Sequence, residues 1–134
     1  MKKSKRQKSK DNPTSNYWKH KADAAWGAYM HRRYNRCAVN QDCAGRLESH
    51  HLLSRAVRAT RHDPANGIML CSLHHKYSPH CSPHGAPLQF AQWLQTNLPD
   101  KWDWVQRHKN DWRTQKANYK EAYERLINET ENIK

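Results

Sequence analysis

The sequence contains few apolar residues and no long apolar run. Hydrophobic residues make up 36% of its 134 residues, and no stretch approaches the roughly 18 consecutive apolar residues of a membrane span. The N-terminal region also lacks the apolar segment that follows the basic start of a secretory signal. We therefore expect an intracellular protein without a membrane partner. A core this poor in apolar side chains usually needs a metal ion or a partner to stabilise it.

Acidic residues are also scarce. The chain has 12 Asp and Glu against 24 Lys and Arg, which gives a net charge of +12. Many of the basic residues precede Asp11, and residues 1–16 contain no apolar residue after Met1. We expect residues 1–16 to form a disordered basic tail, which either remains a solvated arm or contacts phosphates. The charge indicates a polyanionic partner, most simply nucleic acid.

The remaining residues, 17–134, are enough for one domain and too few for two. Apolar residues at helical spacing predict an N-terminal helix over residues 17–36. Residues 37–86 hold every cysteine and most of the histidines, and their prolines and glycines indicate short strands and loops. Two further apolar stripes, one over Phe90–Leu98 and one over Trp112–Ile127, predict helices within residues 87–128, with a break at Pro99.

The cysteines have the spacing of a structural zinc site. Five residues separate Cys37 from Cys43, and Cys71 is followed by His74 after a gap of two. Two such pairs can close a tetrahedral shell, and a reducing compartment favours metal thiolates over disulfides. We therefore predict a Cys3His zinc site formed by Cys37, Cys43, Cys71 and His74. Cys81 either replaces His74 or stays free.

A second set of histidines suggests hydrolytic chemistry. It consists of His50, His51, His75 and His80, with Asn66 between them in the chain. Adjacent histidines on a strand point to opposite faces, so one of His50 and His51 can bind metal while the other acts on water. A neutral imidazole suits proton transfer from water, and a bound cation stabilises charge on a phosphate.

Four segments together resemble the HNH endonucleases, in particular their compact phage-encoded type. These segments are Cys37…Cys43, Leu47-Glu48-Ser49-His50-His51, Thr60-Arg61-His62-Asp63-Pro64-Ala65-Asn66-Gly67 and Leu70-Cys71-Ser72-Leu73-His74-His75. The resemblance covers about residues 37–95 and differs from the family pattern at His74, where cysteine is usual, and at His62, where an aromatic residue is common. It implies a small α+β fold, with a ββα-metal core around a structural zinc and α-helices on both sides.

The resemblance also implies a role for each residue. His51 would be the general base, and Asn66 would hold the loop that aims its imidazole. His50 and His75 would bind a catalytic divalent cation, with His80 as a better third ligand than His84 because it follows His75 by about one helical turn. The basic side chains Arg55, Arg58 and Arg61 lie between the base and Asn66 and are placed to clamp phosphates.

The expected activity is hydrolysis of double-stranded DNA to 5′-phosphate and 3′-hydroxyl ends, by nicking or by double-strand cleavage. We expect a monomer or weak dimer, phage-encoded and acting in the cytoplasm of a bacterial host. The catalytic cation could be Mg²⁺, Mn²⁺, Ni²⁺ or Zn²⁺. The alternative is a zinc-stabilised nucleic-acid-binding module without catalysis, which explains the charge and the zinc ligands but not the alignment of His50, His51, Asn66 and His75. Sequence specificity and biological role are left open.

Overall fold

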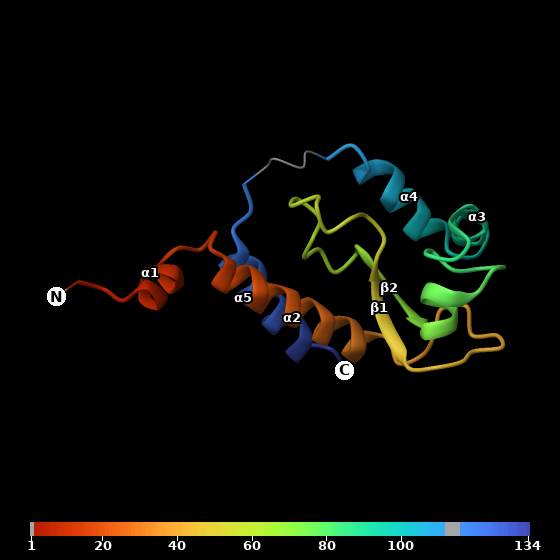
Figure 1. Ribbon diagram of the computed structural model, residues 1–134, viewed down its shortest axis with the longest axis horizontal. Helices are drawn as coiled ribbons and strands as arrows, with labels where there is room; N and C mark the ends of the chain where they lie inside the picture. Colours follow the sequence, from red (N-terminus) through yellow and green to blue (C-terminus); the bar gives the residue numbers. More distant parts are fainter. Residues whose placement is uncertain (1, 112–115) are drawn as a thin grey trace.

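The protein is a small α+β structure in which helices surround a two-stranded sheet (Figure 1). The computed structural model describes residues 2–111 and 116–134. Strands β1 (Leu47–His51) and β2 (Gly67–Cys71) pair antiparallel, with Leu47 opposite Cys71 and His51 opposite Gly67. A short π-helical segment, η1 (Leu73–Tyr77), follows β2 almost directly. The strand pair therefore leads straight into the turn that carries His74 and His75.

Strand β2 is buried on both faces, and its side chains divide between two apolar clusters. Ile68 and Leu70 contribute to a cluster with Phe90 and Leu94 of α3 (Pro87–Asn97). Met69, whose side chain points to the opposite face, contributes to a second cluster formed by Ala25, Trp26, Met30 and Leu126. Because successive side chains of a strand point to opposite faces, this five-residue strand contributes to both apolar clusters.

Helix α2 (Asn16–Arg33) lies along α5 (Tyr119–Glu131), and the two are side by side in Figure 1. The buried residues of α2 are Ala22, Ala25, Trp26 and Met30, a spacing that forms one face of a helix. A Cβ at Gly67 would lie only 2.6 Å from the Met30 side chain. Glycine at this position therefore allows α2 to approach the start of β2.

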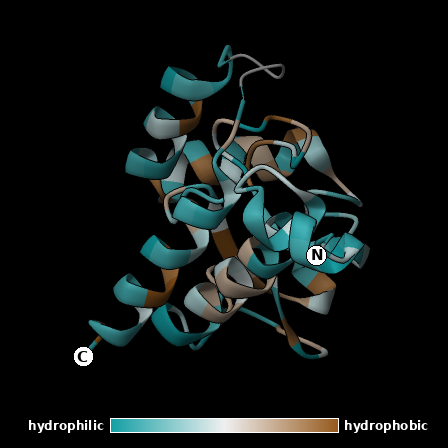
Figure 2. Ribbon diagram, turned by 90° about the vertical axis from the view of Figure 1, so that its left-hand side faces the viewer, coloured by the Kyte–Doolittle hydropathy of each residue, from teal (hydrophilic) through white to brown (hydrophobic). Residues whose placement is uncertain are grey.

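The helices largely follow the sequence expectations, with shifted ends. The helix expected over 17–36 is observed as α2, and Pro99 does separate α3 from α4 (Pro99–His108). The last helix starts at Tyr119, and Trp112, with which we expected it to begin, lies outside the described residues. Most of the ribbon in Figure 2 has the colour of hydrophilic residues, in keeping with the composition.

The N-terminal tail departs from the expected disorder, because Lys5–Asp11 form the helix α1. The side chain of Ser4 caps this helix by accepting a hydrogen bond from the backbone N–H of Gln7. The Trp18 indole of α2 donates to the carbonyl of Lys10 at 2.8 Å. The Ser4 cap and contacts with the start of α2 therefore hold a segment that has no buried residue of its own.

Candidate metal centres and catalytic site

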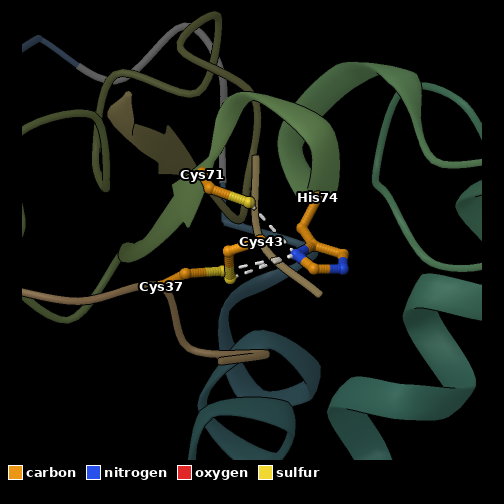
Figure 3. Close-up of side chains that lie close together, drawn as sticks. All are labelled: Cys37, Cys43, Cys71 and His74. Carbon is orange, nitrogen blue, oxygen red and sulfur yellow. Dashed lines mark hydrogen bonds between the residues drawn. The ribbon is translucent and has the colours of Figure 1, made fainter. Parts of the chain in front are cut away.

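Three cysteines and one histidine meet where the loop after α2 reaches the end of β2 (Figure 3). Cys37 and Cys43 come from the loop, Cys71 ends β2, and His74 belongs to η1. The Nδ1 atom of His74 lies 3.1 Å from the sulfur of Cys71, 3.6 Å from that of Cys37 and 3.7 Å from that of Cys43. One potential ligand atom from each residue therefore lies within 4.8 Å of all the others.

These distances fit a tetrahedral zinc ion. Typical zinc bonds to sulfur and to imidazole nitrogen place the two ligand atoms about 3.6 Å apart. Burial raises the pKa of Cys71, but hydrogen bonds from the backbone N–H groups of His74 and Ala44 and from the two neighbouring thiols lower it overall. Burial and the neighbouring thiols raise the pKa of Cys43 to about 11. Cys43 must therefore lose a proton when a metal binds. The Cys3His cluster could hold a structural metal such as zinc.

The loop that supplies two of these cysteines is fixed against the start of η1. The backbone N–H of Leu73 donates to the carbonyl of Ala44 at 3.1 Å, and that of Ser72 donates to Arg46 at 2.9 Å. Gly45 has a φ of +84°, and a Cβ there would lie 2.6 Å from the side chain of Ser72. All four cysteines are free thiols, and Cys81 packs beside the apolar cluster around Cys37. The structure therefore joins His74, rather than Cys81, to the other three ligands.

A second cluster consists of three histidines. The Nδ1 atom of His50, on β1, lies 3.1 Å from Nε2 of His75, on η1. The centroid of the His84 ring lies 5.3 Å from the centroid of the His50 ring and 4.9 Å from that of the His75 ring. Two imidazole nitrogens bound to one ion at 2.0–2.1 Å lie about 3.0–3.4 Å apart, so the His50–His75 pair has suitable spacing.

Two features leave a nitrogen lone pair available on these imidazoles. Burial, followed by the neighbouring histidines, lowers the pKa of His50 to about 3, so its ring is neutral at pH 7. The Nδ1–H of His75 donates to the Glu48 carboxylate at 2.9 Å, which leaves Nε2 with its lone pair toward His50. A histidine ligand held by a carboxylate in this way is common in metal sites.

The third histidine of this cluster is His84, which corrects the expectation of His80. Helix η1 ends at Tyr77, and Ser78 is extended, so no helical turn carries His80 back toward His75. The chain instead turns through Ser82, whose hydroxyl donates to the Ser78 carbonyl at 2.8 Å. The backbone N–H of His84 then donates to the carbonyl of His75 at 3.3 Å. Helical spacing therefore did not indicate which histidine lies beside His50 and His75.

His51 contacts a different set of groups from His50, although both residues line the same cavity. Its Nε2 atom is 2.9 Å from the carbonyl oxygen of Arg61, and its ring stacks on Trp26 at 3.8 Å with an angle of 12°. A carbonyl oxygen only accepts hydrogen bonds, so Nε2 carries the hydrogen and Nδ1 has the free lone pair. Burial is the main reason why the pKa of His51 falls to about 4. The ring is therefore neutral at pH 7.

Asn66 is fully buried and ties together the loop between the two strands. Its side-chain oxygen accepts from the backbone N–H of Leu53 at 2.7 Å. Its amide nitrogen donates to the carbonyls of Thr60 at 3.0 Å and Leu53 at 3.2 Å. Three hydrogen bonds from one side chain thus hold both ends of the loop that contains Arg61.

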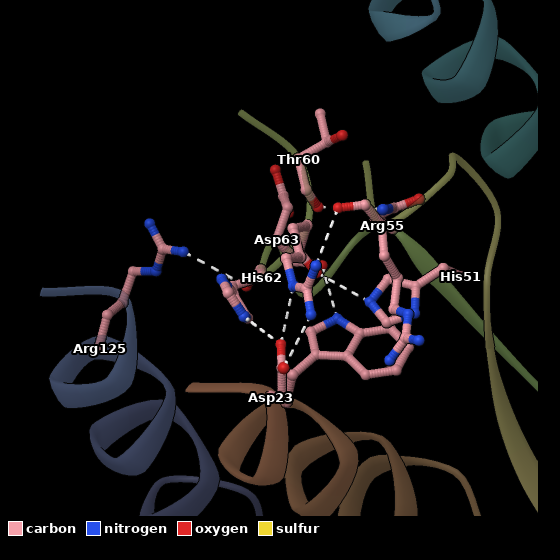
Figure 4. Close-up of polar contacts among 10 residues, drawn as sticks. Asp23, His51, Arg55, Thr60, His62, Asp63 and Arg125 are labelled. Carbon is pink, nitrogen blue, oxygen red and sulfur yellow. Dashed lines mark hydrogen bonds and ion pairs between the residues drawn. The ribbon is translucent and has the colours of Figure 1, made fainter. Parts of the chain in front are cut away.

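Asp23 of α2 binds two residues of this loop (Figure 4). Its carboxylate accepts from Nε and from a terminal nitrogen of Arg61 at 2.9 and 2.8 Å, and from Nε2 of His62 at 2.7 Å. Burial alone would raise the pKa of Asp23, but these hydrogen bonds lower it to about 2. The Arg61 side chain is only 13% exposed. Arg61 is therefore engaged within the protein, contrary to the expected phosphate clamp.

The other two expected clamp residues, Arg55 and Arg58, are exposed. Arg55 lines a cavity of about 470 Å³ together with His50, His51, His75 and His84. Arg58 lines a separate polar pocket beside α5. His62, which stands where an aromatic residue is common in the family pattern, is buried between Asp23 and the ring of Tyr119. Only Arg55 of the three arginines therefore lines the cavity at the histidines.

Sequence reasoning missed three residues that organise this cavity: Asp23, Trp26 and Glu48. Glu48 precedes His50 by two positions on β1, so the alternation of a strand already places both side chains on one face. The alternation could therefore have indicated that Glu48 lies on the same face as His50. Asp23 and Trp26 lie in the apolar and charged pattern of an ordinary amphipathic helix, and their hydrogen-bond partners are 37 to 39 positions away in the chain. No local sequence pattern distinguishes these two residues from the rest of the helix.

Comparisons with known proteins do not assign this chain to a family. A scan of protein-family models, a search of curated proteins and a search of solved structures each found no match. In the part of the chain that the structure describes, every helix is too short or too polar to cross a membrane.

Proposed function

We propose that the protein is a metal-dependent DNA endonuclease of the HNH type. The observation that carries the proposal is the cavity of about 470 Å³, in which His51 lies beside the cluster of His50, His75 and His84. A neutral imidazole with a free nitrogen is thereby combined with a candidate cation site. Hydrolysis of a phosphodiester needs both functions.

The order of the elements also supports this proposal. His50 and His51 are on β1, Asn66 directly precedes β2, and His75 is on η1. The resemblance to the ββα-metal core implies the same order. The net charge of +12 favours a polyanionic substrate, and double-stranded DNA is the one that the resemblance implies.

In the proposed mechanism, Nδ1 of His51 accepts a proton from the attacking water. The hydrogen bond to the Arg61 carbonyl keeps the hydrogen of His51 on Nε2. Nδ1 therefore keeps its lone pair and can act as the base. His50, His75 and His84 would hold a divalent cation, which supplies positive charge to the phosphate and to the departing 3′ oxygen. Exposed Arg55, at the rim of the same cavity, would contact a neighbouring phosphate. As the new P–O bond to water forms, the P–O3′ bond would break, and the departing oxygen would take a proton from solvent water, which leaves 5′-phosphate and 3′-hydroxyl ends.

A plasmid-nicking assay tests the proposal. The zinc-loaded chain is incubated with supercoiled plasmid and Mg²⁺, Mn²⁺, Ni²⁺ or Zn²⁺, with and without a chelator. We expect cation-dependent nicking, which His51→Ala lowers by roughly 100-fold or more, the scale of general-base catalysis. Unchanged nicking by His51→Ala would overturn the role of His51. A parent chain that binds DNA but does not nick with any of these cations would instead indicate the zinc-stabilised binding module.

A further inference from the structure

We infer that Asp23, on the N-terminal helix α2, is a positioning residue for the general base His51. This inference rests on the proposed function and extends it to an element outside the strand-and-turn core. Asp23 does not contact His51 itself. It acts through Arg61, whose side chain Asp23 binds and whose backbone carbonyl holds the imidazole.

The first step of this connection is the pair of hydrogen bonds between Asp23 and Arg61. At 2.9 and 2.8 Å they involve both carboxylate oxygens, which fixes the guanidinium in one plane. A third guanidinium nitrogen donates to the carbonyl of Arg55 at 3.1 Å, so the side chain also crosslinks its own loop. Arg61 is thus held at its outer end by α2 and by the loop backbone.

The second step fixes the backbone on either side of the Arg61 carbonyl. The neighbouring His62 donates to the same carboxylate at 2.7 Å, and Asn66 donates to the carbonyl of Thr60 at 3.0 Å. The peptide group between Arg61 and His62 therefore lies between two side chains that share one anchor, Asp23. Its oxygen is the atom 2.9 Å from Nε2 of His51. Loss of the anchor should let this oxygen move and release the imidazole.

The third step comes from Trp26, one turn after Asp23 on the same helix. Its indole stacks on the His51 ring and donates from Nε1 to the carbonyl of Asp63 at 3.0 Å. Helix α2 consequently restrains both the face of the imidazole and the loop that bonds to its edge. An ion pair serving only stability would not need to coincide with this stacking contact. The coincidence points to α2 as the element that sets the orientation of His51.

The test measures single-turnover nicking by Asp23→Asn, which keeps the shape of the side chain and removes its charge. We expect the rate to fall roughly 10- to 100-fold, as for other residues that support a catalytic group, with unchanged DNA affinity. Asp23→Glu, which keeps the charge, should recover part of the rate. The matched control is Asp103→Asn, an exposed acid on α4, which should nick at the parent rate. Circular dichroism at the assay temperature shows whether each variant is folded.

A double-mutant cycle separates positioning from a general loss of stability. In the His51→Ala background, Asp23→Asn should cause no further loss, because its effect passes through the missing imidazole. A full additional loss in that background would overturn the inference. So would an Asp23→Asn rate equal to that of Asp103→Asn.

A spectroscopic measurement tests the orientation of His51 without measuring activity. The ¹⁵N signals of the His51 ring in the zinc-loaded chain report which nitrogen carries the hydrogen. We expect a single Nε2–H tautomer in the parent and a mixture of tautomers in Asp23→Asn. If the parent does not nick DNA, the proposed function fails, and these signals still show whether Asp23 orients the His51 ring. An unchanged His51 tautomer in Asp23→Asn would overturn it.

Discussion

The two candidate metal clusters lie next to each other and differ in almost every respect. The Cys3His cluster offers four ligands, and three of its residues are buried. The histidine cluster offers three ligands, one of them the exposed His84, and borders a cavity of about 470 Å³. Structural zinc sites are closed by four protein ligands, whereas catalytic sites leave a position for water or substrate. The first cluster could therefore hold a structural ion, and under the proposed function the second would hold the catalytic one.

The clusters are also mechanically connected, because His74 and His75 are neighbours in η1. Successive residues of a helical turn point in different directions, and here one imidazole faces the cysteines and the other faces His50. The turn is closed by the N–H of Ser78, which donates to the Leu73 carbonyl at 2.7 Å. An ion in the Cys3His cluster would thus fix the turn from which His75 reaches the cavity. Loss of the Cys3His cluster, the closed site, should therefore affect both fold and function. Loss of the histidine cluster, the open site, should affect function alone.

The largest effect should follow the loss of the closed site. Cys71→Ser replaces a buried ligand at the end of β2, and we expect it to abolish zinc retention and cooperative unfolding at neutral pH. Structural zinc contributes about 10–16 kcal/mol of binding free energy in small domains, which a core this poor in apolar residues cannot replace. Elemental analysis after desalting and thermal unfolding by circular dichroism measure both effects. Prolonged treatment of the parent with a strong chelator should unfold it in the same way.

Cys81→Ser is the matched control for that experiment. Cys81 is half-buried and packs near Cys37, but it is not one of the four clustered ligands. The variant should retain one zinc ion and the parent unfolding curve. If Cys71→Ser keeps its zinc while Cys81→Ser loses it, the structural site includes Cys81 in place of Cys71. The four clustered residues would then not be the zinc ligands.

A smaller but more selective effect should follow the loss of an open-site ligand. His84→Ala should lower nicking by more than about 100-fold, above the loss usual for residues that only support a ligand. It should leave the zinc content and the unfolding curve unchanged, because His84 is exposed and the Cys3His cluster is intact. His80→Ala is the control and should nick like the parent. Impaired nicking by His80→Ala with normal nicking by His84→Ala would restore the ligand that helical spacing suggested.

This pair of histidines shows where sequence reasoning stops. The spacing of Cys37, Cys43, Cys71 and His74 was informative because each pair is local and zinc geometry requires little else. The spacing from His75 to His80 was misleading because it assumed that the helical turn continues. The turn ends at Tyr77, and contacts of Ser78 and Ser82 decide that His84 returns to the cluster. These contacts depend on loop geometry that no short motif specifies.

Charged residues illustrate the same limit. Arg55, Arg58 and Arg61 look alike in the sequence, yet Arg61 is bound by an aspartate 38 positions earlier and the other two are exposed. The helix α2 itself was predictable from its apolar spacing, because burial of one face requires that period. Which polar residue of α2 would meet the loop was not predictable, since this depends on how closely the helix approaches Gly67. Local periodicity thus predicted the elements but not their contacts.

The smallest effect we predict concerns Glu48, which supports the open site without being one of its three clustered ligands. Glu48→Gln keeps an oxygen to accept the Nδ1–H of His75 but removes the negative charge, which should make Nε2 a poorer ligand. We expect the affinity for the second divalent cation to fall roughly 10- to 100-fold. Isothermal titration of Mn²⁺ or Ni²⁺ into the zinc-loaded chain measures this affinity.

Glu124→Gln, an exposed acid on α5, is the matched control for charge and should bind the cation like the parent. The Glu48 variant should keep its zinc and its unfolding curve, because the carboxylate contacts His75 and not His74. An equal loss of zinc from Glu48→Gln would mean that the two clusters cannot be separated even at their outer residues. The shared turn η1 would then have to be treated as one site with two ions, and the division between a structural and a catalytic metal would no longer hold.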